Sequence, residues 1–193
     1  MVEPLLDEVD PFDERLAALE RAFGKSADVI LHSVVPFVFG FEQGGRADVV
    51  QFREYVDGTV YVTCDLLGSE EQVPNRLGTY ELAICHRPGE DGGAPAIAAL
   101  AYYTLQAPIE PGDTMDAGSI VPEGSPIVAL LFEEFARFDI RGEPAGVLLC
   151  IGITADELSA CRRGQWKRVL KALKSQGVYP FTAWRRRSAL RWF

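Results

Sequence analysis

Few side chains in this sequence could carry acid–base or nucleophilic chemistry. The histidines are His32 and His86. His32 stands in an apolar stretch, which favours a structural role over a catalytic one. His86 follows Cys85 at the end of an alternating segment, and adjacent residues in an extended strand point to opposite faces. A directly paired Cys85–His86 nucleophile is therefore not expected.

Carboxylates are more plentiful, and several surround the Pro/Gly-rich segment of residues 108–126. They are Glu110, Asp113, Asp116, Glu123, Glu133 and Glu134. A buried pair of them could do general acid–base work, whereas the alternative is a solvated acidic rim. One hypothesis is therefore a small carboxylate- or metal-dependent hydrolase that uses residues near 86 and 110–134.

No sequence motif supports that hypothesis specifically. The chain contains no phosphate-binding or dinucleotide glycine pattern, no G-x-S-x-G segment and no CxxC pair. We therefore expect no catalytic residues, no metal site and no cofactor, and we expect a protein that is not an enzyme.

The charge of the chain is divided unevenly. All 28 acidic residues and nine of the 19 basic residues precede Arg162, so this part carries a net −19. The other ten basic residues give the C-terminal segment +10. Such a segment could dock on an anionic surface or on the acidic body of another copy. Nucleic acid is not the expected partner, because the acidic body would repel phosphates.

The cysteines and the apolar runs indicate the cellular compartment in which the protein is expected. Cys64, Cys85, Cys150 and Cys161 are scattered, as is typical of buried free thiols in a reducing cytoplasm. Residues 1–4 lack the basic and apolar regions of a signal peptide. No apolar run approaches the roughly 20 residues of a membrane helix. We expect a cytoplasmic protein without a membrane partner.

The elements that would position these side chains are organised around residues 146–180. An unbroken apolar run at 147–153 predicts a central strand covered on both faces. Thr154 and Glu157 then have the spacing of a capping box, which predicts a helix start. Gly164 divides that helix, and Gly177 and Pro180 end it.

The remaining segments predict an α+β fold, with a mixed, mainly antiparallel sheet and helices packed on it. Expected strands cover 29–35, 49–55, 59–64, 79–85 and 127–132, with a hairpin turn at Asp57-Gly58 and a loop or short strand at 135–139. Expected helices follow Asp10-Pro11 and cover 96–106. We expect an amphipathic helix within residues 1–26 packed on one domain, 27–193, with a basic C-terminal segment.

An ordered set of short segments resembles the suppressor of fused (SUFU) domain. The segments are 61–69, 80–84, 111–114, 130–133, 151–158 and 177–182. Their order and spacing match the family over roughly residues 27–188. The resemblance implies an α+β domain that binds protein without established catalysis. In animal members an extended peptide joins the sheets, which is recognition by strand addition.

The resemblance also implies binding residues and a partner class. The aromatic, aspartate and glutamate that flank the peptide in the family fall on Tyr103, Asp113 and Glu133, with Tyr102 as the alternative for the aromatic. The sequence ends at Phe193 without the second domain of the animal proteins, and so looks like the single-domain bacterial members. Some of these are thought to be immunity proteins that neutralise toxins. The expected partner is another protein, either a toxin or an extended peptide, and the sequence indicates no oligomeric state.

Overall fold

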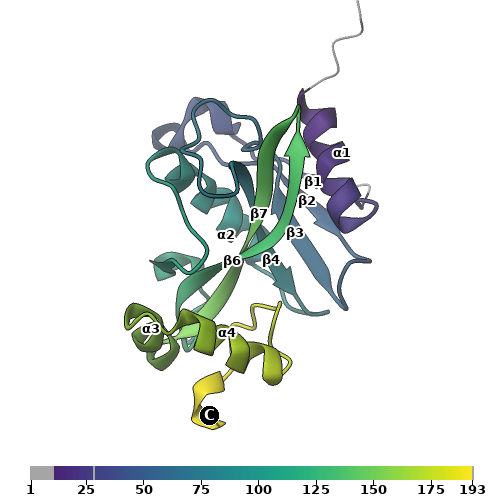
Figure 1. The fold of residues 1–193 in the computed structure, drawn as a ribbon. Helices are drawn as coiled ribbons and strands as arrows, with labels where there is room; N and C mark the ends of the chain where they lie inside the picture. Colours follow the sequence, from purple (N-terminus) through teal and green to yellow (C-terminus); the bar gives the residue numbers. More distant parts are fainter. Residues whose placement is uncertain (1–10, 28, 193) are drawn as a thin grey trace, which may run out of the picture.

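A seven-stranded sheet runs through the chain in the order β1-β2-β3-β4-β7-β6-β5 (Figure 1). The structure is a computed structural model that describes residues 11–27 and 29–192. The strands are β1 (Ile30–Leu31), β2 (Val49–Phe52), β3 (Thr59–Thr63), β4 (Thr79–His86), β5 (Thr114–Asp116), β6 (Ile127–Ile140) and β7 (Glu143–Thr154). Among the paired strands of the described residues, β4 and β7 are parallel and the other pairs are antiparallel, which confirms a mixed, mainly antiparallel sheet.

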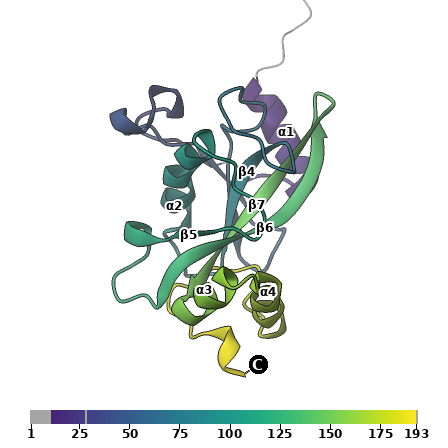
Figure 2. The same cartoon turned by 60° about the vertical axis from the view of Figure 1, so that its left-hand side comes forward.

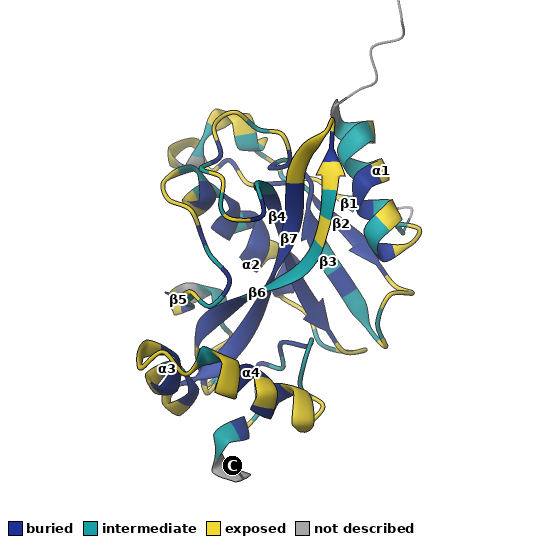
Figure 3. Ribbon diagram, viewed as in Figure 1, coloured by how far each residue is buried: buried dark blue, intermediate teal, exposed yellow. Residues whose placement is uncertain are grey.

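The predicted central strand is confirmed as β7. It lies between β4 and β6, and every residue from Ala145 to Thr154 is buried (Figure 3). Its side chains alternate between two cores: Leu149 and Ile151 belong to one, and Leu148 and Cys150 belong to the other. A strand covered on both faces has no position left for water, which explains its continuous apolar sequence.

Helices cover both faces of the sheet (Figure 2). They are α1 (Pro11–Phe23), α2 (Gly93–Leu100), α3 (Ala155–Arg162) and α4 (Trp166–Ser175). α1 and α4 contribute Leu19 and Leu173 to the first core, and α2 contributes Ile97 to the second. No helix in the described ranges combines the length and the apolar character that crossing a bilayer requires.

Short 3-10 segments connect these elements. They are Phe37–Phe39, Phe41–Gln43, Ala101–Leu105, Gly118–Ile120 and Ala189–Trp192. The predicted 96–106 helix therefore exists in two parts, α2 from Gly93 and a tighter continuation from Ala101.

The capping box and the C-terminal segment meet at Glu157. Glu157 Oε2 accepts from the Thr154 amide at 2.9 Å, and the capping box is complete. The same carboxylate accepts hydrogen bonds from Nη1 and Nη2 of Arg186, at 2.7 and 2.5 Å, and from the Ala189 amide at 2.7 Å. Both side chains of this ion pair are buried. Residues 182–190 are thus part of the packed fold rather than a loose tail.

A second buried carboxylate holds the turn after β3. Glu81 accepts hydrogen bonds from the Thr63 hydroxyl at 2.5 Å and from the amides of Leu66 and Leu67 at 2.8 and 2.9 Å. Its side chain is completely buried. Burial raises the pKa of Glu81 to about 7, and the three donors oppose that rise.

Several sequence predictions differ from the structure in extent, including the strand predicted at 49–55, which ends at Phe52. The predicted strand 29–35 is only Ile30–Leu31, because the Ser33 amide bonds to the Asp48 carboxylate instead of a neighbouring strand. The strand predicted at 127–132 continues to Ile140 with an irregularity between Glu134 and Ala136, so residues 135–139 belong to β6. Asp10, the expected helix cap, lies outside the described residues.

Candidate functional site

The outer edge of β5 is the first feature of the candidate site. β5 pairs with β6 alone among the described strands. The Asp113 carbonyl accepts from Phe132 N at 3.0 Å, and Ala117 N donates to the Val128 carbonyl at 3.0 Å. Because main-chain groups alternate in direction along a strand, those of Thr114 and Asp116 point away from β6. They form an open edge to which an extended peptide can bind.

A groove runs beside this edge, between β5 and the α2–Leu105 segment. It consists of two adjoining cavities of about 470 and 750 Å³. Tyr103 and Met115 line both cavities. The first also has Ile109, Asp113 and Phe132 in its wall, and the second has Pro95, Leu100 and Ile120. The groove therefore offers apolar pockets beside exposed main-chain donors and acceptors.

Tyr103 forms the ridge shared by the two cavities. It lies in the 3-10 segment Ala101–Leu105, and its side chain is 44% exposed. Tyr102, the alternative from the sequence, is half-buried and does not line either cavity. The structure thus places Tyr103, and not its neighbour, beside the open edge.

Asp113 is held at the mouth of the groove by the loop before β5. Its Oδ2 accepts from the Glu110 amide at 2.9 Å, and Gly112 N donates to the Phe132 carbonyl at 2.8 Å. Gly112 has a φ of +102°, and a Cβ there would lie 2.8 Å from the Trp166 indole. The glycine is therefore required for the loop to pack between β6 and α4 while the Asp113 side chain stays exposed.

Glu133 lies on the other face of the sheet. Successive residues of β6 alternate, so Phe132 faces the groove and Glu133 faces α4. Its Oε2 atom is buried without a hydrogen-bond partner. Burial raises the pKa of the Glu133 carboxyl, and the nearby Lys174 ammonium opposes that rise. The structure therefore brings Tyr103 and Asp113 together but does not bring Glu133 to them.

The structure does not bring together the side chains that the hydrolase hypothesis requires, namely His86 and the carboxylates of residues 110–134. His86 is buried, with Nδ1 2.9 Å from the Thr182 carbonyl and 3.8 Å from Glu90 Oε2. Its ring packs 5.5 Å from that of Trp184, and the carboxylates of residues 110–134 are not among its contacts. Cys85 faces the opposite core, as the strand alternation predicted. Asp113 and Glu133 lie on different faces of the sheet.

The position of His32 differs from the prediction, which placed it inside a strand in a structural role. It lies beyond the end of β1 with an exposed side chain, and its Nδ1 is 2.7 Å from Asp48 Oδ2. The reason is the short β1, which ends at Leu31 and leaves His32 in the connection that follows. Among the described residues, no group of three or more His, Cys, Asp or Glu side chains is placed to hold a metal ion.

The sequence did not reveal the strand or the walls of the groove. β5 has three residues, Thr114–Asp116, which is too short for a periodic pattern. Pro95, Leu100 and Met115 look like ordinary core residues in the sequence. Only the register of β5 on β6 shows that they line an open edge.

Comparison with known proteins gives one family. The family model described as Suppressor of fused protein (SUFU) matches residues 46–187. Comparison with curated proteins found no significant match.

Solved structures share the fold at low sequence identity. A SUFU (suppressor of fused protein) homolog from Neisseria gonorrhoeae is 16% identical, with a TM-score of 0.66 over 94% of this chain and 97% of that one. The structure of the Sufu–Fu complex is 15% identical, with a TM-score of 0.68 over 95% of this chain and 93% of that one. Drosophila Suppressor of Fused is 15% identical with a TM-score of 0.63, and the match covers 92% of this chain but 51% of the Drosophila chain.

Proposed function

Because this chain belongs to the suppressor of fused (SUFU) family, we propose that it is a non-enzymatic protein-binding module that adds an extended peptide to the edge of β5. The observation that carries this proposal is the open edge of Thr114 and Asp116 beside a groove of apolar pockets. Strand addition uses main-chain hydrogen bonds for affinity and pockets for alternate side chains for specificity. A peptide strand here would place every second side chain toward Tyr103 and Met115.

Two polar contacts would set the direction and the register of the peptide. Asp113 stands at one end of the groove and Arg46 lines the other cavity. An extended peptide with a basic residue facing Asp113 and an acidic residue facing Arg46 therefore fits best. In this arrangement the Glu133 side chain lies on the other face of the sheet and does not contact the peptide.

The biological setting that we propose is a bacterial, cytoplasmic immunity protein that neutralises a toxin. Two observations support its bacterial and cytoplasmic parts, and the toxin as partner rests on the likeness to single-domain members of the family. The fold covers nearly all of the Neisseria homolog, and Cys64, Cys85, Cys150 and Cys161 are free and buried, which suits a reducing compartment. We also propose that residues 27–193 form a single SUFU-like domain with a basic C-terminal segment and that the helix within residues 1–26 packs on it.

The binding proposal is tested with overlapping peptides that cover the proteins encoded beside this gene. The affinity of each peptide for the full chain is measured by fluorescence polarisation. Tyr103→Ala should weaken the tightest complex by about tenfold or more, because the aromatic ridge is lost. Tyr55→Ala is the matched control, since Tyr55 is also 44% exposed but packs on Phe23 and Phe135 of the first core. Asp113→Asn is compared in the same way with Asp57→Asn.

Hydrogen exchange identifies the binding mode directly. The amides of Thr114 and Asp116 should exchange quickly in the free chain and become protected in the complex. Peptides methylated on alternate main-chain nitrogens should lose affinity in one register only. Equal binding by the Tyr103 and Tyr55 variants, or unchanged exchange at Thr114 and Asp116, would contradict strand addition at β5.

A further inference from the structure

One end of the molecule carries exposed cations that make no ion pair with a described residue within 4.0 Å, although Lys174 and Lys167 act on the half-buried Glu133 carboxylate from farther away. This basic end is formed by α3, α4 and the C-terminal segment (Figures 1 and 2). Six of its exposed members are Arg162, Lys167, Lys171, Lys174, Arg185 and Arg187. In the described part of the chain none of these six lies within 4.0 Å of a carboxylate, whereas Arg186 beside them is paired with Glu157. A cluster of positive charge without close ion pairs, on a protein whose net charge is −9, indicates an interaction surface.

The basic end is held rigidly. α4 packs on the sheet through Val169 and Leu173, and the Glu157–Arg186 pair fixes the chain between Arg185 and Arg187. Lys174 lies 4.4 Å over the Tyr179 ring. A fixed arrangement of charges loses less conformational entropy on binding than free side chains do.

The opposite end carries the complementary surface. A cleft of about 700 Å³ is lined by the carboxylates of Asp48, Asp65, Glu70 and Glu71. Burial, assisted by the adjacent Asp48 charge, raises the pKa of Asp65. Arg15 and His32 also line the cleft, but Arg15 donates to the Leu67 carbonyl and His32 is paired with Asp48.

The rim of this acidic cleft is apolar. Val38, which lines the cleft, is 84% exposed, and Phe39 beside it is 62% exposed. Lysine side chains suit such a mixed surface, since their methylene stems can cover apolar groups while the ammonium reaches a carboxylate.

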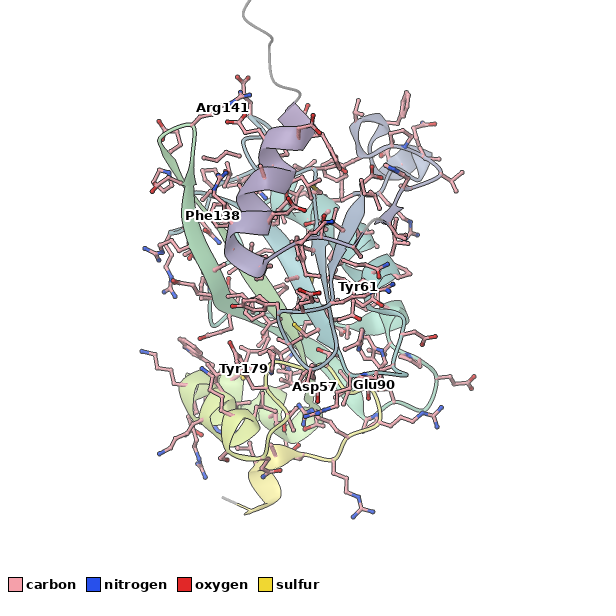
Figure 4. The ribbon with its side chains drawn as sticks, turned by 90° about the vertical axis from the view of Figure 1, so that its right-hand side faces the viewer. Asp57, Tyr61, Glu90, Phe138, Arg141 and Tyr179 are labelled. Carbon is pink, nitrogen blue, oxygen red and sulfur yellow. The ribbon has the colours of Figure 1, made fainter. Side chains whose placement is uncertain are left out.

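The two charged surfaces lie at opposite ends of the fold. Tyr179, which packs under Lys174, and Arg141, which lines a cavity together with Glu70, are far apart along the sheet (Figure 4). We propose that the basic end of one copy docks in the acidic cleft of a second copy, head to tail. A contact between two different surfaces is heterologous, so association continues into longer assemblies unless the rotation closes a ring.

A second copy fits this surface better than a nucleic acid does. Binding of single-stranded nucleic acid uses exposed aromatic side chains on which bases stack. Among the aromatic side chains that the structure describes, the strongly exposed ones are Phe39, Tyr55 and Tyr103, and none of these three lies on the basic end, where Trp166 and Tyr179 are half-buried beneath Lys167 and Lys174. A long polyanion would also extend beyond this end along the acidic body, whereas a second copy brings carboxylates only to the contact.

Sedimentation velocity of the full chain tests the proposal. The wild type should show concentration-dependent association at roughly 0.05 M salt and dissociate at about 0.5 M, because exposed charges are screened. The triple variant Lys167→Glu, Lys171→Glu, Lys174→Glu should raise the dissociation constant at least about tenfold. The control variant Arg21→Glu, Lys25→Glu, Arg53→Glu makes the same change in net charge at other exposed positions and should associate nearly as the wild type does.

A mixing experiment identifies the second surface. The variant Glu70→Lys, Glu71→Lys should also lose self-association, and mixing it with the Lys167/Lys171/Lys174 variant should restore association. The proposal is overturned if the wild type stays monomeric at low salt, if the control variant is as defective as the triple variant, or if mixing restores nothing. Monomeric wild type that binds duplex RNA or anionic vesicles through the same lysines would assign the basic end to that ligand instead. The peptide-binding proposal is unaffected by either result, because β5 lies outside both charged surfaces.

Discussion

Replacing Arg186 by alanine is expected to lower the free energy of unfolding by about 3–5 kcal/mol. The substitution leaves the buried Glu157 carboxylate without the two guanidinium bonds of 2.7 and 2.5 Å that compensate its charge. The same guanidinium also donates to the Gly152 carbonyl at 2.7 Å, so the end of β7 loses a bond as well. Urea unfolding followed by circular dichroism measures the change.

The neighbouring arginines provide matched controls for this experiment. Arg185 and Arg187 have the same charge and the same side chain, but both are exposed and make no ion pair with a described residue. Arg185→Ala and Arg187→Ala should each change the stability by less than about 0.5 kcal/mol. A double variant, Glu157→Gln with Arg186→Met, should recover part of the loss, because it removes both charges at once. If Arg186→Ala is as mild as its neighbours, the buried pair does not hold this end of the fold.

The second large effect concerns pH. Glu81 has a pKa of about 7 in the folded chain against an ordinary value of 4.5. Below pH 4.5 the carboxyl is protonated in both the folded and the unfolded chain. Between pH 4.5 and 7 the unfolded chain ionises while the folded chain keeps its proton, so stability falls as pH rises. The loss from this group should total roughly 3 kcal/mol and should level off above pH 7.

The Glu81→Gln variant isolates this group. The Gln carbonyl can accept from the amides of Leu66 and Leu67, and its NH2 can donate to the Thr63 hydroxyl, which then turns its proton toward the Leu82 carbonyl 3.4 Å away. The variant should therefore equal the wild type in stability near pH 4.5 and exceed it at pH 7.5. Other titrating groups, including buried His86, cancel in the difference between the two chains. Glu71→Gln, at an exposed position, should show no such difference, and parallel pH profiles of wild type and Glu81→Gln would refute the assignment.

The sequence predicted the parts of the fold that local chemistry determines. The apolar run at 147–153, the Thr154–Glu157 capping box and the division at Gly164 are each encoded within a few residues, and each is confirmed. The extent of β6 and β1 could not be predicted in this way. β6 continues through Phe138 because β7 offers a partner to Ile140, and β1 ends because the Asp48 side chain takes the Ser33 amide. Both outcomes depend on partners outside the segment itself: β6 pairs with the strand that follows it, and Ser33 bonds to a side chain 15 residues away.

The arrangement of the candidate site could be predicted only in part. Family resemblance placed Tyr103 and Asp113, which the structure brings to one groove. It also placed Glu133, whose side chain points to the other face of β6. The strand between them, Thr114–Asp116, has no sequence signal of its own, because an edge strand of three residues is defined by its partner.

The distance in sequence between Glu157 and Arg186 has a consequence for biosynthesis. Glu157 is made early enough for α3 to form on the ribosome, but the guanidinium and the Ala189 amide that complete its surroundings emerge about 30 residues later. Until then the Glu157 carboxylate of the nascent chain is exposed to water, whereas in the folded protein it is buried. The part of the sheet next to it also remains uncovered. Closure of this end therefore waits until the segment that carries Arg186 and Ala189 has left the ribosome, and until then a chaperone has access to the exposed core.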